Sequence, residues 1–220
     1  KTLQRMGFKG GKVLDPAMGT GNFFAAMPEE LKNNASLYGV ELDPLTGNIA
    51  KHLHQTSDIQ VTGFEKTDFQ KGSFDVIVGN IPFDNFRLKD SSFKKDYQIH
   101  DYFIKKSLDL VREDGIIAFI SSAGTMDKRD YSFREELSKE AELLGAVRLP
   151  NNAFKQIAGT EVTTDILFFQ KNSSGIEHQT APDWVFSRVD ENYPTISYNN
   201  YFIENKEQVL GDIAVKNFRG

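Results

Sequence analysis

The stretch that decides the fold is KVLDPAMGTGNF, residues 12–23. Its first four residues have the pattern of a short strand, and an amphipathic helical pattern starts at Asn22. Between them lies a turn with two glycines, Gly19 and Gly21. Glycines there let a ligand approach the backbone, and the start of the following helix offers free N–H groups. Strand, glycine-rich turn and helix in this order are typical of the first unit of a doubly wound α/β sheet.

The rest of the chain to about residue 170 continues this alternation. Strands are expected over residues 12–15, 36–41, 59–62, 74–79, 115–120, 143–149 and 165–169, and helices over 22–33, 43–54, 99–112 and 132–142. The pattern predicts a mostly parallel seven-stranded sheet with helices on both faces. No helix separates the last two strands, which indicates one antiparallel strand near an edge. Residues 80–97 are expected to form a long loop.

The hydrophobic periodicity divides the chain into two parts. Residues 1–170 are expected to form one domain, and residues 171–220 a linker and C-terminal extension leading to a missing domain. The extension is expected to pack on the domain or on missing partner sequence. Because the chain begins without methionine and ends in mid-pattern, we expect it to be a fragment of a longer protein.

Composition excludes several classes of site. The 220 residues are 39% hydrophobic and 26% charged, which is ordinary for a globular domain. Without cysteine there are no disulfides, thiolate metal sites or cysteine nucleophiles. The four histidines show no metal-ligand spacing, so we expect no metal. The net charge of −5 provides little attraction for the phosphates of a nucleic acid, so any such contact would need other domains. No apolar run is long enough to cross a bilayer, and we expect a cytoplasmic protein.

Polar residues at successive strand ends suggest a nucleotide-like ligand. Glu41 ends the second strand and can accept hydrogen bonds from two ribose hydroxyls; the alternative is a surface glutamate before a helix. Asp68 can accept from an adenine amino group while Phe69 packs on the ring; a turn aspartate and a core phenylalanine are equally compatible. Phe24 stands where a dinucleotide motif would need its third glycine, which argues against a dinucleotide.

The segment FDVIVGNIPF, residues 74–83, indicates the chemistry. A buried strand runs into Asn80, then a proline-stiffened turn, then the ring of Phe83. The Asn80 side-chain oxygen and the Ile81 carbonyl can accept the two N–H bonds of an exocyclic amine. They would thereby direct its lone pair and stabilise the positive charge that develops on attack. Since the chemistry uses only the carbonyl of residue 81, we expect proline there to be tolerated.

These motifs together resemble the N6-adenine DNA methyltransferases, in the motif order of their gamma type. The resemblance implies the class I fold that binds S-adenosylmethionine, and methyl transfer by direct in-line attack of the amine of a flipped adenine. It assigns cofactor binding to Asp15, Gly19, Thr20, Gly21, Phe23, Glu41, Asp68 and Phe69, and catalysis to Asn80, Ile81, Pro82 and Phe83. Phe83 and Phe154 would contact the target base, although Phe154 is equally compatible with capping the core.

Further stretches are similar to one subgroup. Residues 63–69, 74–83, 99–111, 115–122 and 143–171 are similar to the methylase part of large helicase–methylase fusion proteins of phages and conjugative elements, and to type I modification subunits. The resemblance implies DNA as partner, with recognition or helicase domains in the same parent chain. Two features depart from the family: Ile81 replaces a proline, and the cofactor-binding segment upstream of the first strand is nearly absent. Activity of this chain by itself is therefore an open question.

Other functions stay open at this stage. An RNA base or a protein glutamine amide presents a similar nitrogen to a similar turn, so methyl transfer to either is an alternative. A non-catalytic module of a larger DNA-processing protein is another. The loop over residues 84–98, with four basic and three acidic residues, suits either a DNA-facing loop or a solvated one.

Overall fold

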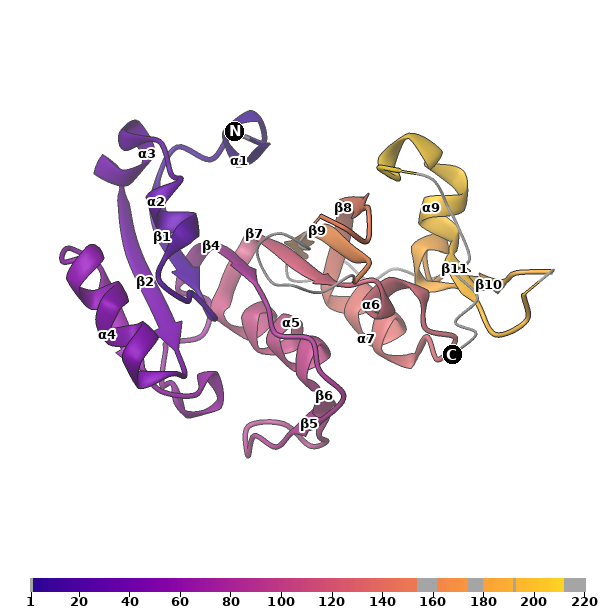
Figure 1. Ribbon diagram of the computed structural model, residues 1–220, viewed down its shortest axis with the longest axis horizontal. Helices are drawn as coiled ribbons and strands as arrows, with labels where there is room; N and C mark the ends of the chain where they lie inside the picture. Colours follow the sequence, from indigo (N-terminus) through magenta and orange to yellow (C-terminus); the bar gives the residue numbers. More distant parts are fainter. Residues whose placement is uncertain (1, 154–161, 174–179, 192, 212–220) are drawn as a thin grey trace.

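The computed structural model describes residues 2–153, 162–173, 180–191 and 193–211 (Figure 1). A seven-stranded sheet in the order β3-β2-β1-β4-β7-β9-β8 runs through it. The strands are β1 Gly11–Asp15, β2 Ala35–Glu41, β3 Asp58–Val61, β4 Phe74–Asn80, β7 Val111–Ser122, β8 Ala141–Leu149 and β9 Thr164–Lys171. Within these strands, β9 pairs antiparallel with β7 and β8, and the other neighbours pair in parallel. This confirms the expected sheet, with its antiparallel strand one position in from the edge.

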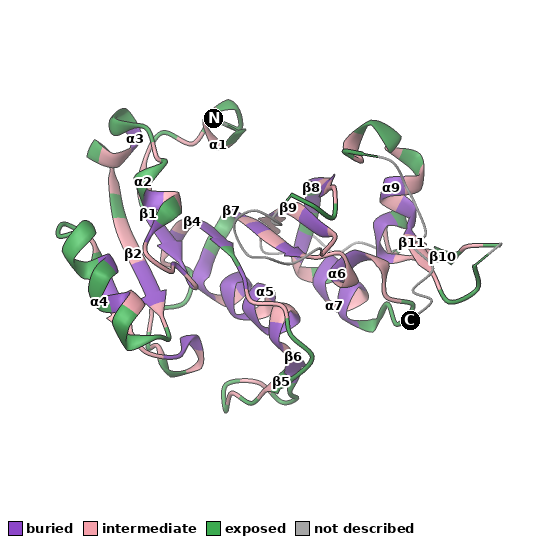
Figure 2. Cartoon of the chain, viewed as in Figure 1, coloured by how far each residue is buried: buried purple, intermediate pink, exposed green. Residues whose placement is uncertain are grey.

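Apolar clusters on both faces of the sheet hold the helices. The helices of this part are α1 Thr2–Arg5, α2 Asn22–Ala25, α3 Glu29–Asn33, α4 Pro44–Leu53, α5 Ile99–Leu110, α6 Gly124–Asp127 and α7 Ser132–Glu140. Ile77 of β4 joins the main cluster with α5 and α7, whereas its neighbours Val76 and Val78 face a second cluster with α1 and α2. Successive strand residues point to opposite faces, so β4 is covered on both sides (Figure 2).

Two local predictions were wrong. The helix expected over 22–33 is split into α2 and α3, because Pro28 has no N–H to donate and takes an extended backbone conformation before α3. The loop expected over 80–97 contains a small antiparallel pair, β5 Arg87–Leu88 with β6 Tyr97–Gln98. Strands of two residues leave no periodic signal in a sequence.

Residues 180–211 pack against the main domain. They form η2 Asp183–Val185, β10 Ser187–Val189, β11 Ser197–Asn199, α9 Asn200–Glu204 and η3 Lys206–Gln208. Trp184, Val185 and Phe202 belong to the main apolar cluster. The buried guanidinium of Arg134 in α7 donates to the Val185 carbonyl at 2.7 Å. These elements lie beyond β8, at the opposite end of the molecule from α4 (Figure 1).

None of the helices in the described residues combines the length and the apolar character needed to cross a bilayer.

Candidate active site

The glycine-rich turn leads from β1 to α2 at the carboxyl edge of the sheet. Gly19 and Gly21 have φ of 56° and 91°, in the left-handed region that favours glycine. His54 braces the turn, because its Nε2 lies 3.0 Å from the Thr20 carbonyl oxygen. A Cβ on Gly21 would come within 2.2 Å of that nitrogen, so this position has no room for a side chain. Phe24, in place of a third glycine, is fully buried and packs edge-on against the His54 ring.

Glu41, the last residue of β2, is fixed beside this turn. One carboxylate oxygen accepts from the Gly19 N–H at 2.9 Å and the other from the Asp43 N–H at 2.8 Å. Asp43 in turn caps α4, because its side chain accepts from the Thr46 N–H. The hydrogen bonds from Thr46 lower the pKa of Asp43. Each oxygen of Glu41 keeps a second lone pair, so the carboxylate is oriented and still able to accept from hydroxyls.

Asp15, at the end of β1, is a buried carboxyl with an unused oxygen. Its side chain is fully buried; Oδ1 accepts from the Ala17 N–H at 3.2 Å, and Oδ2 has no hydrogen-bond partner in the described part of the chain. The pKa of Asp15 is raised from 3.8 to about 7, mainly because burial disfavours the charged form; the hydrogen bond from Ala17 opposes this shift and the nearby charge of Glu41 adds to it. A buried carboxyl in this state suits a site that receives a positively charged group.

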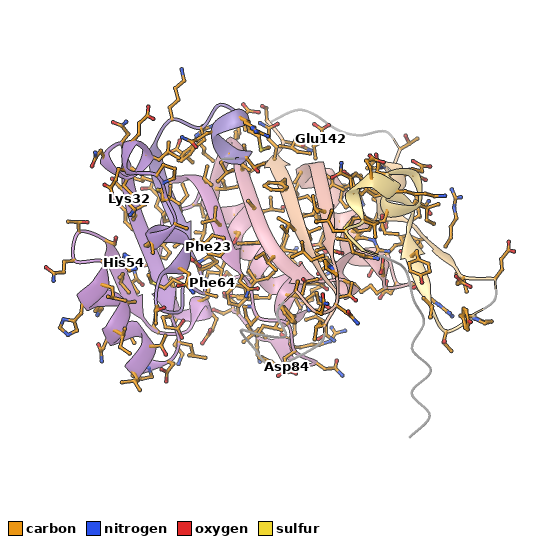
Figure 3. All side chains as sticks on the ribbon, turned by 45° about the horizontal axis from the view of Figure 1, so that its top comes forward. Phe23, Lys32, His54, Phe64, Asp84 and Glu142 are labelled. Carbon is orange, nitrogen blue, oxygen red and sulfur yellow. The ribbon has the colours of Figure 1, made fainter. Side chains whose placement is uncertain are left out.

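The other residues predicted to bind a ligand beside this turn differ in how exposed they are and in what they pack against. Thr20 is part of the turn, and the partly buried ring of Phe23 packs with the second apolar cluster (Figure 3). Asp68 is exposed, and the ring of Phe69 packs edge-on against Tyr38 and Phe74 in the core. The Phe69 ring therefore has core contacts, which was one of the two interpretations of that position.

Sequence reasoning missed a second carboxylate after β3. The short helix η1 Phe64–Lys66 follows β3 closely and carries Glu65. The Glu65 carboxylate folds against Gly63, where an added Cβ would lie 2.3 Å from its Oε1. Glu65 is partly buried, whereas Asp68 is exposed. The signal was present in the sequence, since Glu65 is closer to the strand end than Asp68.

The second predicted motif lies at the end of β4, the neighbour of β1. Asn80 is exposed and pairs with Ile120 of β7, and the Ile81 N–H donates to the Ile120 carbonyl at 3.1 Å. The Ile81 side chain is 1% exposed and belongs to the main cluster, while Pro82 and Phe83 are half-buried. The structure argues against the expected tolerance of proline at position 81, because proline would lose both this hydrogen bond and the packed side chain.

The two motifs abut each other. Gly79 precedes Asn80, and a Cβ on Gly79 would lie 3.0 Å from Oδ1 of Asp15 and 3.4 Å from the Pro16 ring. Such a contact is tighter than a side chain tolerates without displacement of its neighbours. Glycine at position 79 thus lets the end of β4 lie directly against the end of β1.

An open cavity of about 320 Å³ lies just past the ends of β4 and β7. We call it the Phe83 cavity; its walls include Phe83, Asp84, Gln98, His100, Ser122 and Lys128. In Figure 3, Asp84 marks this edge of the sheet, and Glu142, near the start of β8, marks the opposite edge. The Phe83 cavity is therefore on the same edge as Asn80.

A larger cavity of about 910 Å³ lies between this edge and residues 190–211. Arg148 lies in its wall, with its guanidinium paired to both oxygens of Asp165 at 2.8 and 2.9 Å and to Asp127 at 2.8 Å. Its central carbon is 4.2 Å from the centre of the Phe202 ring. These contacts join β8, β9, α6 and α9, and the charge of Arg148 is paired with two carboxylates of the protein itself.

The remaining predictions concern residues around these cavities. Phe154 lies outside the described residues. In the 84–98 loop, Asp90 accepts from the Tyr102 hydroxyl at 2.6 Å and from Lys106 at 3.3 Å, so the loop is anchored to α5. Lys95 pairs with Glu136 of α7 at 2.6 Å. No group of three or more histidine or acidic side chains in the described ranges is arranged to hold a metal ion.

The chain is similar in sequence to known proteins. A sequence model described as N-6 DNA Methylase matches residues 3–210. The chain is 27% identical over 221 residues to "Defense against restriction protein B" of Escherichia phage P1, covering 96% of this chain and 9% of that protein. It is 26% identical over 196 residues to the "Type I restriction enzyme EcoEI methylase subunit" of Escherichia coli, covering 74% of this chain and 38% of that subunit. The chain thus spans less than half of these relatives' length.

Among solved structures, the fold is similar to that of a putative class I S-adenosylmethionine-dependent methyltransferase from Listeria monocytogenes. The TM-score is 0.64 at 20% identity, covering 79% of this chain and 58% of that one. The sheet order, its single antiparallel strand among the described strands and its flanking helices are therefore those of the class I methyltransferase fold.

Proposed function

Because the chain belongs to the N-6 DNA methylase family, we propose that it transfers the methyl group of S-adenosylmethionine to the exocyclic N6 amine of adenine in DNA. The observation that carries the proposal is the direct contact between the two motifs. Gly79 brings Asn80 against the end of β1, where Asp15 and the Gly19–Gly21 turn lie. An amine held by Asn80 would thus be next to a ligand held by the turn.

The residues at the end of β1 and β2 fit S-adenosylmethionine. The oriented carboxylate of Glu41 would accept from the ribose hydroxyls, and the unpartnered Oδ2 of Asp15 would face the cationic part of the ligand. The Gly19–Gly21 turn, with Thr20, would lie along it, and Phe23 would support the turn from the second cluster. When bound, this cofactor supplies an electrophilic methyl group on a sulfonium.

The carboxylates after β3 would receive the adenine end of the cofactor. The sequence prediction was that Asp68 accepts from the adenine amino group while Phe69 packs on the ring. Glu65, in η1 shortly after β3, is an additional carboxylate. An exocyclic amine of adenine donates two hydrogen bonds, so a carboxylate is a suitable acceptor there.

The turn at Asn80 would hold the target amine. The side-chain oxygen of Asn80 and the carbonyl of Ile81 would accept one N–H each, and Phe83 would stack on the base after it leaves the duplex. The carbonyl of Ile81 has a fixed direction, because its N–H is bonded to Ile120, its side chain is buried, and Pro82 follows. Phe154, which lies outside the described residues, would also contact the base.

We propose that other parts of the full-length protein hold the DNA. A net charge of −5 releases few counterions on binding, so a recognition or helicase domain in the same chain would supply most of the affinity. On this view residues 1–170 are the catalytic domain, and residues 171–220 connect it to the next domain.

The experiment that tests the proposal identifies the methylated product. The full-length gene product is incubated with S-adenosylmethionine labelled on the methyl group and with DNA, RNA or protein, and the products are digested and separated. We expect the label in N6-methyladenine from DNA. Label in RNA bases or in glutamine instead would assign the chain to one of the alternative substrates, and a folded protein that binds no cofactor would be a non-catalytic module.

A further inference from the structure

The glycine-rich turn is attached to both ends of α4. Before α4, the Glu41 carboxylate accepts from the Gly19 N–H at 2.9 Å and from the Asp43 N–H at 2.8 Å. After α4, Nε2 of His54 lies 3.0 Å from the carbonyl oxygen of Thr20 (Figure 3). Two neighbouring residues of the turn are therefore each held by a side chain from a segment that flanks α4.

The contacts of the His54 imidazole fix both its position and its tautomer. The ring packs edge-on against the fully buried ring of Phe24, with 5.7 Å between the ring centres. A Cβ added to Gly21 would come within 2.2 Å of Nε2, so the imidazole lies directly against the α-carbon of that glycine. Because a carbonyl oxygen can only accept a hydrogen bond, Nε2 carries the proton in its contact with Thr20.

The peptide unit between Thr20 and Gly21 is the part of the turn that this contact fixes. Its N–H donates to the Met18 carbonyl at 2.8 Å, and its carbonyl oxygen faces His54. Gly21 has a φ of 91°, but glycine populates negative φ about as readily, so Gly21 does not by itself prevent the peptide from rotating. Rotation would reverse the directions of the N–H and the carbonyl, and the hydrogen bonds on both sides of the peptide oppose it.

We propose that His54 is a positioning residue for the cofactor: its Nε2–H holds the Thr20 carbonyl and keeps the turn in the backbone conformation that binds S-adenosylmethionine. This rests on the proposed function, which assigns the turn to that cofactor. His54 acts through the turn and needs no contact with the ligand. If the turn adopts the binding conformation only part of the time, the apparent affinity falls in proportion to that fraction, whereas the complex, once formed, is the same.

The binding test compares two amides at position 54 that differ by one methylene group. His54→Gln keeps an N–H donor at about the reach of Nε2, whereas the shorter side chain of His54→Asn does not reach the Thr20 carbonyl. His52→Asn, at an exposed position in the last turn of α4, is the matched control. In calorimetry of the full-length protein, His54→Asn should bind S-adenosylmethionine about tenfold more weakly, as expected for the loss of one hydrogen bond. His54→Gln and His52→Asn should stay close to wild type.

Steady-state kinetics with saturating DNA distinguish positioning from a general structural effect. His54→Asn should raise KM for the cofactor by about the same factor as the dissociation constant and keep kcat near that of wild type, because saturating cofactor restores the turn. Equal cofactor affinities of His54→Asn and His54→Gln would overturn the inference, as would a lower kcat with an unchanged KM. Either result, beside a wild type that forms N6-methyladenine, would leave the proposed function intact.

A second measurement needs neither cofactor nor turnover. Nitrogen NMR of the free protein, with the His54 signals assigned by their loss in His54→Gln, should show a proton on Nε2. A neutral ring with its proton on Nδ1 alone would contradict the inference, because such a ring cannot donate to the Thr20 carbonyl. If folded wild type binds no S-adenosylmethionine, the inference fails together with the cofactor assignment of the proposed function.

Discussion

Asp15→Asn should make the protein more resistant to alkaline pH while it impairs cofactor binding. The Asp15 carboxyl is fully buried, and burial raises its pKa from 3.8 to about 7. A folded pKa above the unfolded one means that the folded state binds the proton more tightly. The stability that the protonated carboxyl contributes is complete below pH 3.8 and is lost as the pH rises through 7.

The size of the effect follows from the two pKa values. Between pH 5 and pH 8 the proton linkage lowers the free energy of unfolding of wild type by about 3 kcal/mol. Asparagine has the same shape, keeps the acceptor for the Ala17 N–H and has no proton to lose. The stability of Asp15→Asn relative to wild type should therefore rise by about 3 kcal/mol between these two pH values.

Urea denaturation at pH 5 and pH 8 measures this difference. Asp58→Asn at the exposed start of β3 is the matched control and should change the free energy of unfolding by at most about 0.5 kcal/mol at either pH. Calorimetry at pH 8 should show weaker cofactor binding by Asp15→Asn, because a neutral amide does not attract the cationic part of the ligand. If the difference in the free energy of unfolding between wild type and Asp15→Asn is the same at pH 5 and pH 8, the raised pKa of a buried Asp15 carboxyl is refuted.

Three further substitutions test neighbouring parts of the site. Glu41→Ala should weaken cofactor binding by about 1–3 kcal/mol in calorimetry, since it removes an oriented acceptor, and unchanged affinity would contradict its role. Glu65→Gln should weaken cofactor binding more than Asp68→Asn, because Glu65 is partly buried near the end of β3; the reverse order would restore the original assignment. Ile81→Pro should cost about 3 kcal/mol of stability in denaturation, against about 1 kcal/mol for Ile81→Val, which keeps the N–H; equal costs would contradict the importance of that hydrogen bond.

The centre of the sheet was predictable because its central strand β4 is buried on both faces. The run from Phe74 to Gly79 is apolar except for Asp75 and is flanked by turn residues, and it forms the central strand β4 as expected. The break between α2 and α3 was also visible in the sequence at Pro28, which a continuous helix does not accommodate. The pair β5–β6 was not predictable, since each strand has two residues and owes its place to contacts of the loop with α5.

The site was predictable where a motif follows a strand and unpredictable where distant segments meet. Glu41 and Asn80 could be placed because parallel strands end at the same edge of the sheet. The ring of Phe69 was ambiguous, because one aromatic residue after a turn suits a core and a ligand equally well. His54 and Thr20 are 34 positions apart in the sequence, and their contact depends on how α4 packs beside the turn. No spacing rule anticipates such a contact.

The measurement that tests the central claim most directly compares Asn80→Ala with Asn85→Ala in the full-length protein. Both substitutions remove an exposed asparagine side chain near the same turn, but only Asn80 would accept from the target amine. Cofactor affinity is measured by calorimetry, and formation of N6-methyladenine is measured with labelled methyl groups. We predict that Asn80→Ala lowers turnover about a hundredfold or more with nearly unchanged cofactor affinity, and that Asn85→Ala stays close to wild type. Full turnover by Asn80→Ala would contradict the assignment of Asn80 as the residue that orients the amine.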